Sequence, residues 1–593
     1  MRELRSLLPY LRPYRRTYAF GMVLVIVSNY FTTLGPRYIE RAIDALRQGS
    51  AFHQVQIALV LLLAVALAGG VARYGMRELL NSGSRRVETD LRDHLFHHLQ
   101  RMSAEFYDRY PTGDVMARTT NDLLAVRMVA GPALMYLVDT TIRALLIAPA
   151  MVTISPRLTA MAFIPLLGLP VAMVSLGQSV HRRSQAIQAQ FSDLTSQAHE
   201  NLSGVRVVRA YRQEQAETAA FERLSKDYLR RNLQLARVQG LFFPLLTMLG
   251  GLSAVVVLYA GGQLVMRGNV TVGEFVAFGV YLGMLVWPMI ALGWAVNLVQ
   301  RGAASMGRIN ELFAQRPAIT SPQAPEAPLP ANGGRTVEFR GVWFAYPGAA
   351  DRGWVLEDVS FQVGAGRSLA IVGATGSGKS TLVDLLVRAY DPDRGAVLLD
   401  GIDVRRLALA ELHRAIGFVP QETFLFSDSV RENVLLGAPD DGRLEQVAEV
   451  AQLTEALPAL PDGYETVLGE RGINLSGGQK QRAAIARALA QDPPVFVLDD
   501  ALSAVDAHTE AKILRALRGA LEGRTSIVVS HRLAAVRDAD WILVLDGGRI
   551  VEQGTHVELI GRGGRYWELL RRQQLEEELE EEEVGGEPAQ DRV

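Results

Sequence analysis

The sequence contains no cysteine. A chain without cysteine has no disulfide framework, no zinc–thiolate site and no catalytic thiol. Lysine is also scarce, because the chain has only Lys226, Lys379, Lys480 and Lys512, and its net charge is −2. A balanced charge creates no overall field that attracts nucleic acid. We therefore expect neither thiol chemistry nor a nucleic-acid partner.

Long apolar stretches, by contrast, are abundant before residue 300. Each of them is close to the ~20 residues that a membrane-spanning helix needs. The stretches are 17–43, 55–76, 129–153, 158–180, 241–265 and 272–298. The 16 residues before them are basic and amphipathic, which favours a helix on the membrane surface. The first apolar run is too long for a signal peptide, so we expect no cleavable signal.

The connections between these stretches alternate in length and charge. Residues 77–128 and 181–240 are long and rich in arginine, whereas the other connections are short and hold few arginines. Arginine-rich connections remain on the cytoplasmic side of a membrane. We therefore expect the long connections and both termini in the cytoplasm. Each long connection also contains a glycine, Gly113 or Gly204, that interrupts a helical pattern.

A proline-rich segment at 315–335 divides the chain and has the composition of a linker. From 336 to 574, short β-rich runs alternate with helical ones, as in an α/β domain. The glutamate-rich end, 575–593, is expected to be a solvated helix extension or a disordered tail. The predicted fold class is an all-α transmembrane domain of six spanning helices, 1–314, fused to an α/β P-loop domain.

A glycine-rich loop lies between an apolar run that ends at Val372 and a helical pattern that begins at Thr381. Its residues are Gly373, Ala374, Thr375, Gly376, Ser377, Gly378, Lys379 and Ser380. Strand, loop and helix in this order are the context of a phosphate-binding loop. Backbone N–H groups and the helix N-terminus attract phosphate, Lys379 is expected to reach the β- and γ-phosphates, and Ser380 to hold Mg²⁺. A glycine turn without a ligand is the alternative, but a lysine at this position in a lysine-poor chain argues against it.

Two further segments carry the same chemistry. The apolar run from Val495 ends in Asp499, whose carboxylate is expected to join the Mg²⁺ shell, since Mg²⁺ prefers oxygen ligands. The second segment, Leu475 to Gln479, is a glycine turn that opens a helix and creates another anion-binding N-terminus. A second cradle on one domain makes sense if it serves a nucleotide held by another copy of that domain.

In combination and order, these motifs resemble those of ATP-binding-cassette (ABC) exporters, and the resemblance covers nearly the whole chain. It implies a half-transporter of the type I exporter (type IV) fold with ATP and Mg²⁺ as cofactors. The resemblance implies that Tyr346 stacks on adenine, that Gln421 contacts Mg²⁺ and that His531 contacts the γ-phosphate. It also identifies Ser476, Gly477, Gly478 and Gln479 as the signature, Asp506 as the D-loop acid, and the Gly113 and Gly204 segments as coupling helices.

One departure from the family pattern bears on catalysis. ABC exporters normally carry glutamate directly after the Mg²⁺ aspartate, as the base that positions the attacking water, and this chain has Asp500. A misplacement of ~1 Å can cost about 10²-fold in rate. We therefore expect a degenerate site that binds ATP and hydrolyses it slowly, beside a homologous partner subunit that carries glutamate. A homodimer with Asp500 as a working base is the alternative.

Charges inside a membrane are expensive and often functional. Asp139 and Arg143 are spaced i, i+4 in the third apolar stretch, so they either pair with each other or line a cavity that contacts substrate. Tyr281, Met284, Trp287 and Trp294 in the last stretch are candidates for an apolar substrate wall, with packing or interfacial anchoring as the alternative.

The best overall interpretation is an exporter of drugs, lipids or peptides in the inner membrane of a bacterium, with its nucleotide-binding domain in the cytoplasm. An ATP-gated channel or regulator is a rival, because a slow site favours long-lived closure of the ATP-binding domains. A soluble ATPase is excluded by the six apolar stretches. Fold alone does not name the substrate.

Overall fold

The computed structural model describes residues 3–49, 52–166, 168–326, 333–348, 353–532 and 536–585. The chain divides into two compact units. Met1–Gln100 and Pro111–Gln315 form the first, and Arg101–Tyr110 and Arg316–Val593 form the second. The second unit thus takes residues 101–110 from the predicted transmembrane domain. Residues 327–332 of the predicted linker and 586–593 of the predicted acidic extension lie outside the described residues.

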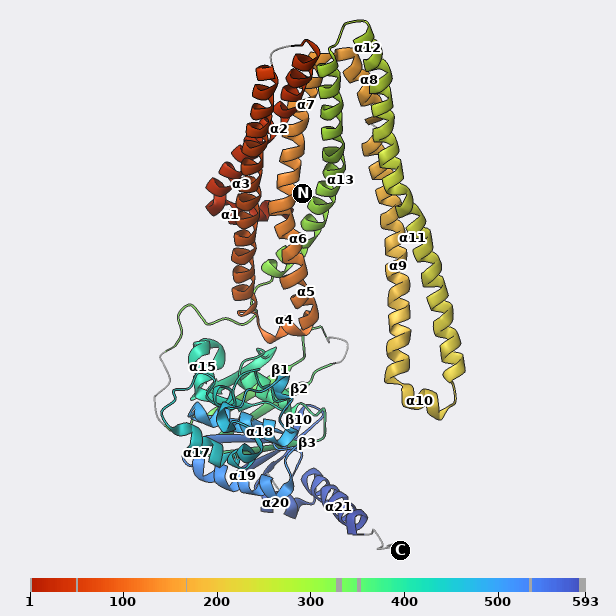
Figure 1. Cartoon of the computed structure of the whole chain (residues 1–593). Coiled ribbons are helices and arrows are strands. Elements are labelled where there is room, and N and C mark those ends of the chain that lie inside the picture. Colours follow the sequence, from red (N-terminus) through yellow and green to blue (C-terminus); the bar gives the residue numbers. More distant parts are fainter. Residues whose placement is uncertain are drawn as a thin grey trace. The chain divides into compact units, whose positions relative to one another are not determined.

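Helices form the first unit (Figure 1). Its long helices are α2 (Arg15–Arg47), α3 (Phe52–Leu99), α7 (Leu134–Ile154), α9 (Gly168–Ser203), α11 (Glu214–Val256) and α13 (Val272–Ala314). Its short helices are α1 (Leu8–Leu11), α5 (Thr112–Ala117), α6 (Leu123–Met128), α8 (Pro156–Leu166), α10 (Val205–Ala210) and α12 (Gly262–Met266). Helices α9 and α11 lie side by side and are joined through α10.

The described residues contain five helical stretches that are long and apolar enough to cross a membrane. They are Glu3–Arg47, Phe52–Leu99, Thr112–Ile154, Thr247–Met266 and Val272–Ala314. Each contains or overlaps one of the predicted apolar stretches. The remaining predicted stretch, 158–180, includes residue 167, which lies outside the described residues.

The start of α13 is tied to the end of α2. Thr271 and Glu274 form a capping box, in which Glu274 N–H donates to Thr271 Oγ1 at 3.0 Å. Asp44 on α2 accepts from Thr271 Oγ1 at 2.7 Å and from Gly273 N–H at 2.9 Å. Two carboxylates therefore offset the positive end of the α13 dipole. Gly273 is needed for this approach, because a Cβ there would lie 2.5 Å from the Glu40 carbonyl oxygen.

The two predicted breaks in the long connections differ in origin. Gly204 ends one helical run and precedes α10, as its position predicts. Gly113 lies inside α5, so the prediction of a break there is wrong. The break falls at Tyr110 and Pro111, because proline lacks an N–H and is tolerated at the beginning of a helix. The short helix α4 (Ala104–Arg109) precedes this break and belongs to the second unit.

Two sheets form the described centre of the second unit. The first, antiparallel, has the strand order β2-β1-β4-β5, and the second has the order β10-β9-β3-β8-β7-β6. The strands are β1 (Val337–Phe344), β2 (Leu356–Val363), β3 (Ser368–Gly373), β4 (Arg394–Leu399), β5 (Ile402–Asp403), β6 (Ile416–Val419), β7 (Val495–Asp499), β8 (Thr525–Val529), β9 (Trp541–Asp546) and β10 (Arg549–Gly554). Strands β3 and β7 are buried and apolar, as strands covered on both faces are.

Helices accompany these sheets in the alternating order that an α/β domain requires. They are α14 (Lys379–Leu386), α15 (Leu409–Ala415), α16 (Val430–Leu435), α17 (Arg443–Val450), α18 (Gly477–Ala490), α19 (Ala507–Ala520), α20 (His556–Arg562) and α21 (Arg565–Gly585). The predicted fold class, a helical transmembrane domain fused to an α/β domain, is confirmed.

A substitution on α13 tests the packing of the first unit. A Cβ at Gly302 would lie 2.1 Å from Val129 Cγ2 and 3.0 Å from the Ala125 carbonyl oxygen. Overpacking of this kind costs about 1–3 kcal/mol. We expect Gly302→Ala to lower the melting temperature of the purified protein in detergent. Gly283→Ala on the same helix is the matched control, because a Cβ there meets nothing within 4 Å. An equal melting temperature for both variants would contradict this packing.

Candidate functional site

The ends of three neighbouring strands bring the nucleotide motifs together. β3 pairs in parallel with β8, and β8 pairs in parallel with β7. Parallel strands end at the same edge of a sheet, and ligands bind at that edge in open α/β folds. β3 ends at Gly373, β7 at Asp499 and β8 at Val529. The phosphate loop, the two acids Asp499 and Asp500 (the Walker acids) and His531 therefore follow one another along one edge.

The phosphate loop has the backbone shape that its glycines predict. Gly378 has a φ of 98°, and a Cβ there would lie 2.8 Å from Leu356 Cδ2. Lys379 Nζ donates to the carbonyl oxygens of Gly373 and Ala374 at 2.8 and 2.9 Å. Burial lowers the pKa of Lys379, and the nearby carboxylates of Asp500 and Asp499 oppose that shift.

Ser377 supplies an independent test of whether this loop fits a phosphate. Its hydroxyl oxygen is buried and has no hydrogen-bond partner among the described residues. Buried polar atoms without a partner are rare in folded proteins, and a bound group or water usually completes them. The loop thus combines a cation, a helix N-terminus and an unsatisfied hydroxyl. This donor set fits a phosphate chain.

Two oxygen ligands for a cation adjoin the loop. Ser380 Oγ donates to Asp499 Oδ1 at 3.1 Å. Burial raises the pKa of Asp499, and the hydrogen bond from Ser380 acts in the opposite direction. No group of three or more His, Asp or Glu side chains suited to a metal occurs in the described part of the chain. Ser380 and Asp499 therefore fit Mg²⁺ that takes its remaining ligands from phosphate and water. Gln421 is exposed on the loop that follows β6.

Asp500 and His531 contact each other directly. Asp500 Oδ1 lies 2.8 Å from His531 Nδ1, so the ring donates when this nitrogen carries the proton. The backbone of Asp500 has a φ of 48°, and its N–H donates to the Val529 carbonyl oxygen at 2.8 Å. Asp500 is therefore held by one hydrogen bond from its backbone and one at its carboxylate. The sequence predicted both residues for the site but not this bond.

Tyr346 lies beside the helix that follows the phosphate loop. Its hydroxyl oxygen is 3.1 Å from Thr381 Oγ1 and donates to Asp384 Oδ2 at 3.3 Å. Burial raises the pKa of Asp384, and the charge of Asp499 raises it further. Sequence reasoning missed Asp384. Its spacing of three residues from Thr381, which places both on one helix face, was the available signal.

The signature forms a separate local structure with the D-loop. Ser476 and Gln479 close a capping box at the start of α18, with Gln479 N–H donating to Ser476 Oγ at 3.3 Å. Gly477 and Gly478 pack against Ala504, where a Cβ on Gly478 would lie 2.9 Å from the Ala504 carbonyl oxygen.

Gln481, which sequence reasoning missed, joins the signature helix to the D-loop. Its Nε2 donates to Ser503 Oγ at 3.1 Å and its Oε1 accepts from Ala504 N–H at 3.0 Å. Asp506 caps α19 by accepting from Thr509 N–H at 2.9 Å. Within the described residues, no hydrogen bond joins the signature to the phosphate loop. The phosphate loop and the signature are thus two distinct anion-binding structures on one chain.

Comparison with known proteins agrees with this geometry. Residues 18–289 match the family described as ABC transporter transmembrane region, and residues 356–503 match the family described as ABC transporter. A relative from Bacillus subtilis, the "Probable multidrug resistance ABC transporter ATP-binding/permease protein YheI", is 40% identical over 95% of this chain and 97% of its own length. The chain belongs to the ABC transporter family.

Other relatives place it among the exporters. The "Multidrug resistance-like ATP-binding protein MdlA" of Escherichia coli is 34% identical over the full length of both chains. The "ATP-dependent lipid A-core flippase" of Syntrophus aciditrophicus is 33% identical over 98% of this chain and 96% of its own. A solved structure of a bacterial Atm1-family ABC exporter with ATP bound matches with a TM-score of 0.76 and 28% identity, over 94% of this chain and 99% of that one. The chain is an ABC exporter with an ATPase domain coupled to transport.

The predicted charge pair in the membrane domain of this ABC exporter includes a third residue. Arg143 Nη2 donates to Asp139 Oδ2 at 3.2 Å. Asn29 on α2 donates to Asp139 Oδ1 at 2.8 Å and accepts from Arg143 Nε at 3.0 Å. These bonds favour the interpretation that the two charges pair with each other. They also fasten α7 to α2.

The predicted apolar substrate residues on α13 differ in exposure. Tyr281 is 1% exposed and its hydroxyl donates to the Thr33 carbonyl oxygen at 2.8 Å, which favours the packing alternative for this residue. Met284 is partly buried. Trp287 and Trp294 are 64% and 43% exposed, and Trp294 packs edge-on against Tyr136 at 5.1 Å. The two tryptophans are therefore the exposed members of the set.

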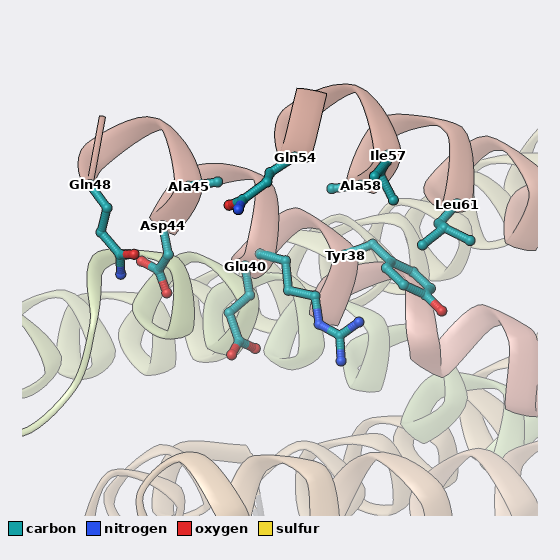
Figure 2. Close-up of a pocket in the computed structure, with 10 residues that line it drawn as sticks. Tyr38, Glu40, Asp44, Ala45, Gln48, Gln54, Ile57, Ala58 and Leu61 are labelled. Carbon is teal, nitrogen blue, oxygen red and sulfur yellow. The ribbon is translucent and has the colours of Figure 1, made fainter. Parts of the chain in front are cut away.

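A pocket of about 360 Å³ lies between the end of α2 and the beginning of α3 (Figure 2). Glu40 and Asp44 line it from α2, Gln48 lines it from the residue that follows α2, and Gln54 lines it from α3. Asp44 already accepts two hydrogen bonds from the start of α13. Its position is therefore explained by the junction of α2 with α13, and we assign no ligand to the pocket.

Removal of one hydroxyl tests the cation site. Ser380→Ala deletes an oxygen ligand and the hydrogen bond to Asp499, so the affinity for Mg-ATP should fall about tenfold or more, equivalent to ~1.4 kcal/mol. A fluorescent ATP analogue measures binding with Mg²⁺ and with EDTA. Affinity in EDTA should change little. Ser368→Ala is the control, because Ser368 lies at the other end of β3 and bonds Asp540. An equal loss with and without Mg²⁺ would contradict the cation role.

Proposed function

We propose that this chain is one subunit of a heterodimeric ABC exporter and that its own Walker site hydrolyses ATP slowly. The observation that carries the proposal is Asp500, which stands where the family resemblance expects glutamate. The complex lies in the inner membrane of a bacterium, with the nucleotide-binding domains and both termini in the cytoplasm. Arginine in the long connections supports this orientation.

The geometry around Asp500 supports a slow site. The Asp500 N–H bonds Val529 and its carboxylate bonds His531, so the side chain has little freedom to advance. Aspartate is also one methylene shorter than glutamate. In-line attack on a phosphate depends on how water is positioned, and a ~1 Å error costs about 10²-fold. ATP binding does not need this base, because the phosphate loop and Asp499 remain intact.

The intact signature of this chain has a second role, at the ATP site of the partner subunit. Ser476 and Gly478 lie at the start of α18, and among the described residues neither hydrogen bonds to the chain's own phosphate loop. In ABC exporters each site combines the Walker residues of one subunit with the signature of the other. The signature of this chain therefore completes the competent site on a partner that carries glutamate. We expect the signature of that partner to be altered. The altered signature and Asp500 would then lie in the same, slow site.

The first unit leaves a large surface uncovered, which supports a partner subunit. Between residues 175 and 240, Gln190 is the only side chain that is buried. Apolar residues are exposed along the hairpin of α9, α10 and α11, among them Phe191, Leu202, Val207, Tyr211, Leu229 and Leu233. Exposed apolar surface of this extent marks an interaction site. In the nucleotide-binding unit, Phe424 and Phe426 are likewise half exposed and pack edge-on at 5.2 Å.

The substrate class follows from the relatives and from α13. The names of the relatives refer to multidrug resistance and to a lipid A-core flippase. Trp287 and Trp294 are exposed on an apolar helix. Aromatic side chains of this kind accommodate amphipathic or hydrophobic compounds. We therefore assign drugs, lipids or peptides with apolar parts as the transported substrates.

The transport cycle then follows from the two cradles. The paired nucleotide-binding domains close when each Walker site meets the signature of the other subunit. Helices α4 and α10, in the predicted coupling segments, pass this movement to the spanning helices. The substrate cavity changes from inward-facing to outward-facing, and hydrolysis at the partner's site resets it. Ligands shift such an equilibrium only through different affinity for its two states.

Two variants of this chain test the asymmetry in the purified complex. Asp500→Ala should leave ATP turnover within about twofold, because the slow site contributes little. Ser476→Asp should reduce turnover by about 10²-fold or more, because it places a negative charge against the partner's bound phosphate. Aspartate also caps helices well, so α18 remains folded. Ser476→Thr keeps both cap and charge and is the control.

The homodimer alternative predicts a different outcome. If Asp500 is a working base, Asp500→Ala stops turnover as fully as Ser476→Asp does, and the degenerate-site proposal is wrong. A gated channel is distinguished by transport, since it never accumulates substrate against a gradient. Melting temperatures of all variants identify any loss of folding.

A further inference from the structure

Two aromatic rings, those of Tyr390 and Phe344, pack against Tyr346, the predicted adenine platform. Tyr346 packs edge-on against Tyr390, with ring centroids 5.3 Å apart and an angle of 88°. Phe344, at the end of β1, packs against both rings at 5.0 and 5.6 Å. Tyr390 follows α14, the helix that begins in the phosphate loop. The platform is therefore one member of a packed aromatic group.

Tyr390 also contacts α4. Its hydroxyl donates to the Asp108 carboxylate on that helix. Burial raises the pKa of Tyr390, and the charge of Asp108 raises it further. The hydroxyl thus remains a donor at neutral pH. Residues 101–110 cluster with the second unit, so this bond lies within one compact body.

We propose that Tyr390 is a positioning residue that links occupancy of the Tyr346 platform to the position of α4. One rigid side chain makes both contacts, with its ring on Tyr346 and its hydroxyl on Asp108. A base that stacks on Tyr346 confines the ring pair and makes the Tyr390–Asp108 bond persist. The inference rests on the proposed function only in requiring ATP at the phosphate loop.

Thermodynamic linkage makes this contact a two-way coupling. If ATP strengthens the hold on α4, a movement of α4 changes ATP affinity by the same factor. The neighbouring charges fit this role, because Tyr346 also donates to Asp384, which feels the charge of Asp108. Stacking of a base on Tyr346 and release of α4 therefore oppose each other, because both involve the contacts among Tyr346, Tyr390 and Asp108.

Hydrogen exchange of the complete complex tests the link without a transported substrate. We measure exchange of peptides that cover 101–110 and 373–381, with and without Mg-ATP. In the unmodified protein, Mg-ATP should slow exchange in both peptides, by about fivefold or more at α4. In Tyr390→Phe, which keeps the ring and loses the hydroxyl, ATP should still protect 373–381. The ATP-dependent change at 101–110 should be lost.

Further variants separate coupling from packing. Asp108→Ala should have the same effect, and the double variant should go no further than either single one. Glu105→Gln is the control on α4, because Glu105 pairs with Arg109 on the same helix, and it should retain the ATP-dependent change. If Tyr390→Phe speeds exchange at α4 equally with and without ATP, its role is structural and the proposal is overturned. Absence of ATP protection at 373–381 in the unmodified protein would overturn both this proposal and the proposed function.

Discussion

The parallel pairing of β3, β8 and β7 is the constraint on which the site depends. It brings Gly373, Asp499 and Val529 to one edge, although they come from widely separated parts of the chain. Ser380 then reaches Asp499, and His531 reaches Asp500. Each of these contacts fails if one strand shifts by a residue, because a shift turns every side chain to the other face. The buried apolar strands that hold this register are therefore as necessary as the polar residues that they carry.

In the proposed function, this edge binds ATP well and hydrolyses it slowly. The phosphate loop is complete, with a lysine, an unsatisfied buried serine and a paired cation site. The position after the Walker aspartate holds a shorter acid that is already engaged with His531. Binding and hydrolysis need different groups, so a chain can keep the first and lose most of the second. In the proposed heterodimer, the intact signature of such a chain completes the ATP site of the partner.

The sequence predicted those features that short motifs determine. The phosphate loop, the Walker strand, the signature helix and most spanning helices follow from local glycine placement and apolar runs. It missed contacts between distant residues. Asn29 joins Asp139 across 110 positions, and Tyr390 joins Asp108 across 282. No local pattern specifies such pairs, because they depend on how the elements pack. The sequence left open whether Tyr281 packs or contacts substrate, and its hydrogen bond to the distant Thr33 carbonyl oxygen favours packing.

Subunit composition is the measurement that tests the central claim most directly. A tag on this chain recovers the complex from native membranes, and mass spectrometry identifies what accompanies it. The account predicts one homologous ABC chain in equal amount, with glutamate after its Walker aspartate. Recovery of this chain alone, as a homodimer that hydrolyses ATP rapidly, would contradict the asymmetric mechanism and make Asp500 a working base.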